Sequence, residues 1–266
     1  MRLTFPALLI SILLLTGCEK SIYFVENDPN YPTIIKKINP DQLDKIKLDF
    51  AQQNIYLKTS LDEYGFCGYS DSPPEALTPP IDTTVSESEV IEIAKEFLAT
   101  NSEFTGIENS DNLEFKRVEM MHGFWDGNKG WHMNTINQRI DTIEVLYTSI
   151  LVNIRGEAVY YCVGNWYPDI YIPKEFNCDS KTAKGLLLNK TVTHYGWGGP
   201  YDVVISSESL QESNTRLYVL PVETEDHTEL HLTWCINIPA PVHFKIYVDV
   251  MTGKLLSEEP TIYSLI

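Results

Sequence analysis

The feature that most constrains the fold is a helical pattern followed by strand patterns, which occurs twice along the chain. Every second residue from 242 to 250 is apolar, and a period of two indicates a strand with one buried face. The buried side chains are expected to be Val242, Phe244, Ile246, Val248 and Val250. The opposite side chains, left to water or to a partner, are His243, Lys245, Tyr247 and Asp249.

The strongest helical pattern precedes the first group of strands. Ser86 and Glu89 match the capping box that begins many helices, and apolar residues recur behind them at helical spacing as far as Leu98. This predicts an amphipathic helix over residues 87–100. Such a helix has one apolar face to bury against a sheet.

Two weaker helices are also predicted. Asp179 or Ser180 can begin a short helix ahead of the second group of strands. Asn39 can cap a helix over residues 40–53, in which Pro40 takes the first position.

The strand patterns complete two units that share the same order of elements, a helix followed by strands. Each unit is expected to be a helix packed on an antiparallel sheet, which makes the fold class α+β. The first unit spans residues 81–172 and the second spans residues 173–266. The expected strands cover residues 113–121, 131–137, 142–154, 158–163, 201–206, 217–222, 230–238 and 242–250.

The first 18 residues have the pattern of a secretory signal. Arg2 precedes an apolar run over residues 3–15, which is shorter than the roughly 20 apolar residues of a membrane-spanning helix. The run ends in Leu-Thr-Gly followed by Cys18, which resembles the lipobox of bacterial lipoproteins. The resemblance implies that residues 1–17 are removed and that Cys18 is lipidated, so we expect a cell-envelope protein tethered to a bacterial membrane. The alternative is an ordinary signal peptide in which Cys18 is incidental.

Residues 18–80 are expected to comprise an N-terminal tether, a segment with little predicted structure, and a proline-rich linker. Residues 19–32 are polar and show no periodicity, as in a tether. Two Ser/Thr-Pro-Pro sequences at residues 72–74 and 78–80 predict a stiff linker before the first unit.

The charge balance excludes one class of partner. The chain carries 37 acidic and 20 basic side chains, a formal net charge of −17 at pH 7. Proteins that bind nucleic acid need a basic surface to neutralise phosphates, so nucleic acid is not expected as a partner.

Four cysteines remain after Cys18, namely Cys67, Cys162, Cys178 and Cys235. An even number in an oxidising compartment is compatible with disulfides, and four cysteines allow three pairings. Buried free thiols are the other interpretation. The sequence leaves both open.

The sequence shows no convincing catalytic, cofactor or metal site. It has no G-x-S-x-G, P-loop or G-x-G-x-x-G motif. His227, Glu229 and His231 would share one face of a strand and could meet a metal ion. The stronger interpretation is the solvent-facing side of a strand whose other side is core, so we predict no metal, no cofactor and no catalytic residue.

Two aromatic segments are candidate partner-binding sites. Tyr195, Trp197 and Tyr201 lie in a glycine-rich segment, and Trp166 and Tyr167 lie beside a proline. Large rigid rings of this kind often anchor interfaces. The alternative is that both segments fold their rings back onto the sheets.

Several of these segments together resemble a known family. Residues 230–234 read Leu-His-Leu-Thr-Trp, and residues 247–256 read Tyr-Val-Asp-Val-Met-Thr-Gly-Lys-Leu-Leu. They are similar to the end of PepSY domains, although Val250 stands where that motif usually has Ala. Residues 138–145 and 153–159 look like the companion fungalysin/thermolysin propeptide motif. The resemblance spans about residues 86–260.

The family resemblance implies a function without catalysis. In that family the region is an intramolecular chaperone and inhibitor of a zinc peptidase, but none of the six histidines here lies in an H-E-x-x-H motif. We therefore expect a stand-alone, propeptide-like lipoprotein that binds and restrains or chaperones an envelope peptidase. The alternative is a lipid-anchored binding or signalling module for a glycan or for the outer domain of a sensor protein.

Overall fold

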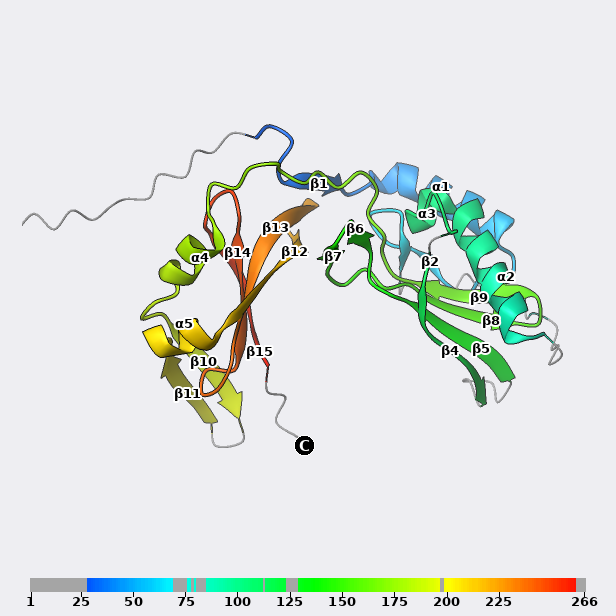
Figure 1. Cartoon of the computed structure of the whole chain (residues 1–266). Coiled ribbons are helices and arrows are strands. Elements are labelled where there is room, and N and C mark those ends of the chain that lie inside the picture. Colours follow the sequence, from blue (N-terminus) through cyan, green and yellow to red (C-terminus); the bar gives the residue numbers. More distant parts are fainter. Residues whose placement is uncertain are drawn as a thin grey trace, which may run out of the picture.

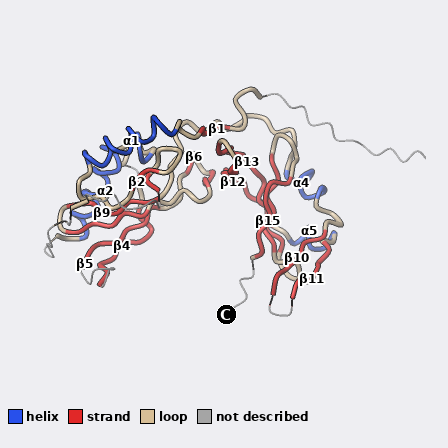
Figure 2. The backbone as a smooth tube through the Cα atoms, turned by 180° about the vertical axis from the view of Figure 1, so that it is seen from behind, coloured by secondary structure: helices blue, strands red, loops and turns tan. Residues whose placement is uncertain are grey.

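The computed structural model describes residues 28–68, 76–77, 79, 85–111, 113–122, 129–196 and 199–261. Two lobes lie side by side, with strands β1, β6 and β7 at their junction (Figures 1 and 2). Helices and antiparallel sheets make up both lobes, so the fold class is α+β. The predicted signal peptide, Cys18 and most of the proline-rich linker lie outside the described residues.

The first lobe is a four-stranded antiparallel sheet covered by helix α2. Its strands follow the order β4 (Phe115–His122), β5 (Lys129–Thr135), β8 (Leu151–Arg155) and β9 (Ala158–Val163). Helix α2 (Glu87–Thr100) begins at the capping box of Ser86 and packs Val90, Ala94 and Leu98 into the core. The predicted bounds of this helix and of strand β9 are confirmed.

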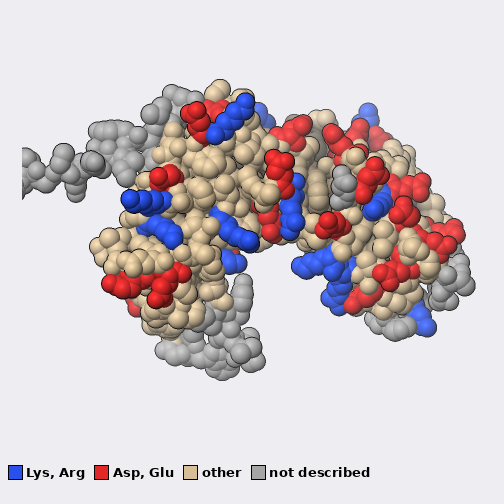
Figure 3. All heavy atoms as spheres, viewed as in Figure 1, with Lys and Arg blue, Asp and Glu red and all other residues tan. Residues whose placement is uncertain are grey.

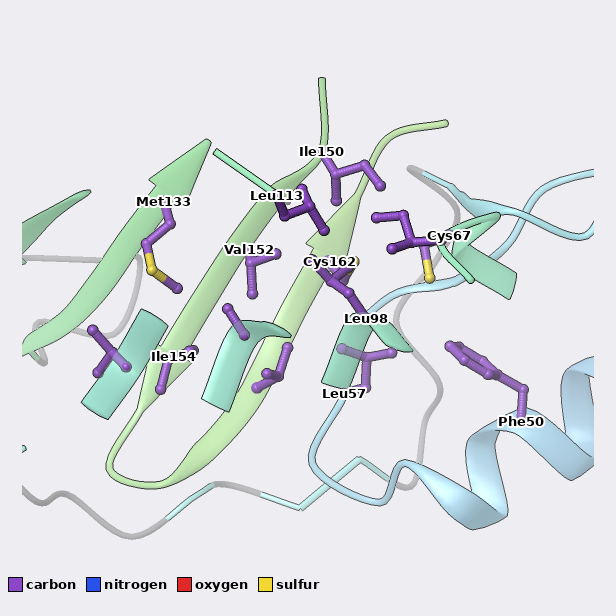
Figure 4. Close-up of a cluster of buried hydrophobic side chains, with 14 of the residues drawn as sticks. Phe50, Leu57, Cys67, Leu98, Leu113, Met133, Ile150, Val152, Ile154 and Cys162 are labelled. Carbon is purple, nitrogen blue, oxygen red and sulfur yellow. The ribbon is translucent and has the colours of Figure 1, made fainter. Parts of the chain in front are cut away.

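The segment ahead of the linker completes the first lobe. Helix α1 (Pro40–Gln53) has the predicted bounds and Asn39 as its cap, and strands β2 (Ser60–Leu61) and β3 (Cys67–Gly68) form a small hairpin. Helix α3 (Ser102–Thr105) follows α2. Phe50 and Leu57 are buried in the same hydrophobic cluster as Leu98 (Figure 4). The chain is therefore folded here, where the sequence predicts only the helix over residues 40–53.

The second lobe is built on a larger sheet. Its strands follow the order β15 (Leu255–Pro260), β14 (Phe244–Asp249), β13 (His227–Ile238), β12 (Asn214–Glu223), β7 (Ile143–Val145) and β6 (Arg139–Ile140). Two short helices, α4 (Ser180–Leu186) and α5 (Ser207–Glu212), contact β13 where the sequence predicts one helix. The alternating apolar residues from Val242 to Val250 are buried, as predicted.

Strands β6 and β7 connect the two lobes. They lie between β5 and β8 in the sequence, yet β7 pairs in parallel with β12 of the second sheet. The predicted continuous strand over residues 142–154 is wrong. The chain leaves strand β7 after Val145, passes through the left-handed conformation at Tyr147 (φ 61°), and begins β8 at Leu151 in the other sheet. Residues assigned by sequence to the first unit thus belong to the second sheet.

Strand β1 (Thr33–Lys36) makes a second connection between distant parts of the chain. It pairs antiparallel with residues 227–230 of β13, whereas β14 pairs with residues 233–238 of the same strand. The long strand β13 therefore has two different neighbours along one edge. The residues that directly follow the predicted tether thus form an integral strand of the second sheet, and no strand was predicted there from the sequence.

The face of the second sheet opposite the alternating apolar residues is also partly buried. Tyr247 is 2% exposed and Asp249 is fully buried, although both were expected to face water or a partner. Tyr247 packs in a small cluster with Cys235 and Leu220, and Leu146 from the β7–β8 connection packs against it. Leu146, which the sequence assigned to the first unit, thus helps to cover the face of β14 that the alternating pattern predicts to be exposed.

Candidate functional site

Two exposed aromatic rings lie on a two-stranded hairpin of the second lobe. Strands β10 (Thr191–Gly196) and β11 (Gly199–Val204) pair antiparallel, and the hairpin lies at the end of the lobe away from the first lobe (Figures 1 and 2). Tyr195 is 84% exposed and Tyr201 is 54% exposed. The hairpin therefore presents two large rings to solvent.

Contacts of His194, two residue pairs from the turn, hold the hairpin in place. His194 is buried, and its Nε2 lies 2.6 Å from the carbonyl oxygen of Val242. Its ring packs edge-on against Phe244 at 4.7 Å and stacks with Tyr201 at 4.9 Å and an interplanar angle of 12°. Because His194 fixes the orientation of Tyr201, little side-chain entropy remains to be lost when that ring meets a partner.

The structure separates the predicted binding residues into different places. Tyr195 and Tyr201 share the hairpin, and Trp197 lies outside the described residues. Tyr167 is 6% exposed and packs edge-on against Phe66, so its ring is a core residue rather than a contact surface. The reason is that two hydrogen bonds with the side chain of Gln138 hold the backbone of Tyr167.

Trp166 is intermediate in exposure between Tyr195 and Tyr167. It is half-buried and packs against the core of the first lobe. Together with Tyr167 and residues 106–109 it lines an open hollow of about 240 Å³. The fold therefore does not bring Trp166 together with the hairpin, and the two predicted aromatic segments form no common site.

A row of hydrogen-bonded polar side chains lies where β1 meets the second sheet. The hydroxyl of Tyr31 donates to Oδ2 of Asp249 at 2.6 Å, and Nδ1 of His231 donates to the same oxygen at 2.7 Å. Nε2 of His231 donates to Oε2 of Glu229 at 2.8 Å. The other carboxylate oxygen of Glu229 lies 3.1 Å from Nε2 of His227. We refer to Tyr31, His227, Glu229, His231 and Asp249 as the polar row.

Asp249 also organises the turn between β14 and β15. Its Oδ1 accepts hydrogen bonds from the backbone N–H groups of Met251 (2.9 Å) and Thr252 (2.7 Å). Gly253 follows with a φ of 66°, a conformation that suits glycine. One buried carboxylate therefore connects the N-terminal segment, strand β13 and this turn.

The charges in the polar row stabilise one another. Burial alone would raise the pKa of Asp249, but hydrogen bonds from His231 and Tyr31 outweigh burial and hold that pKa below its usual value. Burial alone would lower the pKa of His231, but hydrogen bonds with Asp249 and Glu229 outweigh it and the pKa is raised. Both ring nitrogens of His231 face carboxylates, and only the protonated imidazolium can donate from both.

The polar row does not provide a metal site. His227, Glu229 and His231 share one side of β13, as the sequence indicated, but their hydrogen bonds are with one another and with Asp249. Within the described ranges no group of three or more His, Cys, Asp or Glu residues is arranged to hold a metal ion.

Acidic side chains line a hollow on the first lobe. It has a volume of about 590 Å³, lies along helix α2, and includes the carboxylates of Glu89, Glu92, Glu96 and Glu157. On the face shown in Figure 3, basic side chains lie scattered among acidic ones over both lobes. Of the helices that the structure describes, none has the length and apolar character needed to cross a membrane.

Comparisons with known proteins find a similar structure but no related family. No family and no curated protein matches this chain. Among solved structures, the chain is similar to the one described as the Bacillus megaterium YpeB C-terminal domain, with a TM-score of 0.29 and 10% sequence identity. The match covers 86% of this chain and all of that chain.

Proposed function

We propose that this chain is a non-catalytic lipoprotein of the bacterial cell envelope that binds and restrains or chaperones a peptidase. The observation that carries the proposal is the β10–β11 hairpin, on which Tyr195 and Tyr201 are exposed while buried contacts of His194 fasten the hairpin to the lobe. Exposed Tyr rings held by a rigid scaffold lose little entropy on binding and bury a large area, which is why they frequently anchor interfaces.

The choice of a peptidase as partner rests on the PepSY resemblance. The residues that carry it, at 230–234 and 247–256, form the centre of the second lobe, and the hairpin is packed on the same lobe through Phe244. A propeptide-like module recognises its peptidase by surface contacts and needs no catalytic group of its own. Lipidation of Cys18 would hold the module at the membrane, because several acyl chains on one residue anchor firmly.

The test is a crosslinking pull-down from intact cells with the lipidated chain as bait. We expect recovery of a peptidase, and saturable loss of its activity when the soluble Cys18→Ala form is added. The Tyr195→Ala variant should weaken binding by about tenfold or more, since loss of one anchor ring costs more than about 1.4 kcal/mol. It should unfold like the parent protein, because Tyr195 is 84% exposed.

A matched control distinguishes binding through the hairpin from nonspecific binding through any exposed apolar side chain. Leu48 on α1 is 59% exposed and lies in the other lobe, so Leu48→Ala should leave binding unchanged. Unchanged binding by Tyr195→Ala would exclude the hairpin as the contact surface. Recovery of a sensor protein or of glycan-handling proteins without a peptidase would instead support the alternative binding or signalling module.

A further inference from the structure

Two cysteines that are distant in the sequence meet in the core of the first lobe. Cys67 lies on β3 and Cys162 lies on β9, about 95 positions apart. The backbone N–H of Gly164 donates to the carbonyl oxygen of Cys67 at 3.0 Å, which holds the two strands together at this point. Cys67 is 1% exposed and Cys162 is fully buried, and both belong to one hydrophobic cluster.

The two thiols lie in the same part of the core. Strands β3 and β9 contact each other, and Figure 4 shows Cys67 and Cys162 among the apolar side chains of one cluster. Interaction with Cys67, together with burial, raises the pKa of the Cys162 thiol. Two buried cysteines on neighbouring strands, beside the backbone hydrogen bond from Gly164 to Cys67, are the pair best placed for a disulfide.

The other two cysteines differ from this pair. The sulfur of Cys178 lies 3.7 Å from the carbonyl oxygen of Asp179, and the thiol of Cys235 interacts with Tyr247. They belong to two different hydrophobic clusters of the second lobe. Burial raises the pKa of each to about 11, as burial also raises that of Cys162, so the difference from the pair is that Cys178 and Cys235 lie in separate clusters.

We propose that Cys67 and Cys162 form a disulfide that joins the N-terminal segment to the sheet of the first lobe, whereas Cys178 and Cys235 remain thiols. The proposal rests on the envelope location proposed above, because disulfides persist in oxidising compartments. The bridge would connect β3, which precedes the proline-rich segment, to β9, which follows α2 and most of the first sheet. It would thus fasten α1 and the β2–β3 hairpin to the first lobe covalently.

The oxidation requires a disulfide oxidant, either a thiol–disulfide oxidoreductase or a small-molecule disulfide. One cysteine thiolate attacks the oxidant and forms a mixed disulfide, with release of one oxidant thiol. The second cysteine thiolate then attacks the mixed disulfide and releases the other oxidant thiol. The two cysteines lose two protons and two electrons in total, and the oxidant disulfide is reduced to two thiols. Because the folded core excludes solvent from both sulfurs, exchange is fastest before the core closes during folding.

The first arm of the test is refolding of the soluble Cys18→Ala form in a buffer of oxidised and reduced glutathione. Free thiols are then counted with a maleimide under denaturing conditions, and peptides are mapped by mass spectrometry. We expect two of the four thiols to be lost and the peptides that contain Cys67 and Cys162 to be linked. The Cys178→Ala/Cys235→Ala double variant should form the same bridge, and Cys67→Ala should form none.

Stability under reducing conditions provides an independent measurement. The thermal midpoint of the oxidised parent protein should fall when a reductant is added, and that of the Cys67→Ala/Cys162→Ala double variant should not change. Four free thiols after refolding, or a bridge that includes Cys178 or Cys235, would overturn the proposal.

The second arm uses protein isolated from cells with thiols trapped at lysis. A Cys67–Cys162 bridge in this material supports both the disulfide and the oxidising location. If the bridge forms with glutathione but the cellular protein has four free thiols, the proposed cellular bridge is refuted and the proposed location is called into question. The peptidase-binding test does not depend on either result, so the two proposals fail separately.

Discussion

Replacement of Asp249 by Asn tests how much the polar row contributes to stability. The carboxylate of Asp249 is fully buried and accepts hydrogen bonds on both oxygens. An amide of the same shape keeps one acceptor oxygen and replaces the other with an NH₂ group. If the amide oxygen faces the turn at Met251 and Thr252, the NH₂ group meets the donors of Tyr31 and His231.

The expected cost follows from the two hydrogen bonds that Asp249→Asn removes. Hydrogen bonds to a charged group contribute about 1.5 to 3 kcal/mol each, and removal of one partner from a buried ion pair costs about 3 to 5 kcal/mol. We therefore expect Asp249→Asn to lower the free energy of unfolding by about 3 to 5 kcal/mol. The matched variant Tyr31→Phe removes one hydroxyl and keeps the ion pair, so it should cost about 1.5 to 3 kcal/mol.

The pH dependence provides a signature specific to the row. The pKa of His231 is raised in the folded state, so its contribution is complete below about pH 6.5 and is lost as pH rises through the folded pKa. The pKa of Asp249 is lowered, so its contribution is complete above about pH 4 and is lost as pH falls through the folded pKa. The stabilisation by the row is therefore largest between about pH 4 and pH 6.5.

The assay is urea unfolding of the parent protein and both variants at a series of pH values, followed by tryptophan fluorescence. The difference in unfolding free energy between the parent protein and Asp249→Asn should be largest in this window and should shrink on both sides. A difference that is constant with pH, or a cost below that of Tyr31→Phe, would refute the ion pair of His231 and Asp249.

Three further substitutions test the backbone and the helix start. Gly106 has a φ of 73°, and a Cβ there would lie 1.7 Å from the carbonyl oxygen of Trp166, so Gly106→Ala should destabilise the protein by about 2 kcal/mol or more in urea unfolding. Gly185 in α4 has no atom within 4 Å of an added Cβ, so Gly185→Ala should instead stabilise by about 0.5 to 1 kcal/mol, and equal effects at the two positions would contradict this explanation. Ser86→Ala removes the cap of α2 and should cost about 1 kcal/mol, whereas an unchanged midpoint would show that the capping box contributes nothing.

Local patterns were sufficient to predict the elements with strong periodicity. The helices over residues 40–53 and 87–100 and the strand over residues 158–163 have the predicted bounds, because capping residues and apolar spacing act within a few positions of one another. Strand β15 was missed, since its sequence ends in Ser-Glu-Glu-Pro and lacks an apolar alternation. An edge strand can carry such residues because its outer side is not buried.

Local sequence patterns were not sufficient to predict which residues of the candidate site are exposed. Tyr167 and Tyr195 both lie beside residues that break regular structure, and the sequence treated them alike. Tyr195 is exposed, whereas Phe66 and Gln138 from distant parts of the chain bury Tyr167. Exposure of a ring depends on which segments pack on it, and no local signal distinguishes these two.

The sequence by itself determined the α+β class and the burial of the alternating apolar residues from Val242 to Val250, because a period of two places these side chains on one face whatever packs on the other. The tertiary structure alone decided how the two lobes join and which polar groups are buried. Strand β7 pairs with β12, and Tyr31 bonds to Asp249 from 218 positions away. Such contacts form where folding brings complementary edges and hydrogen-bonding groups together, and the free energy that selects them is gained only when both segments are in place.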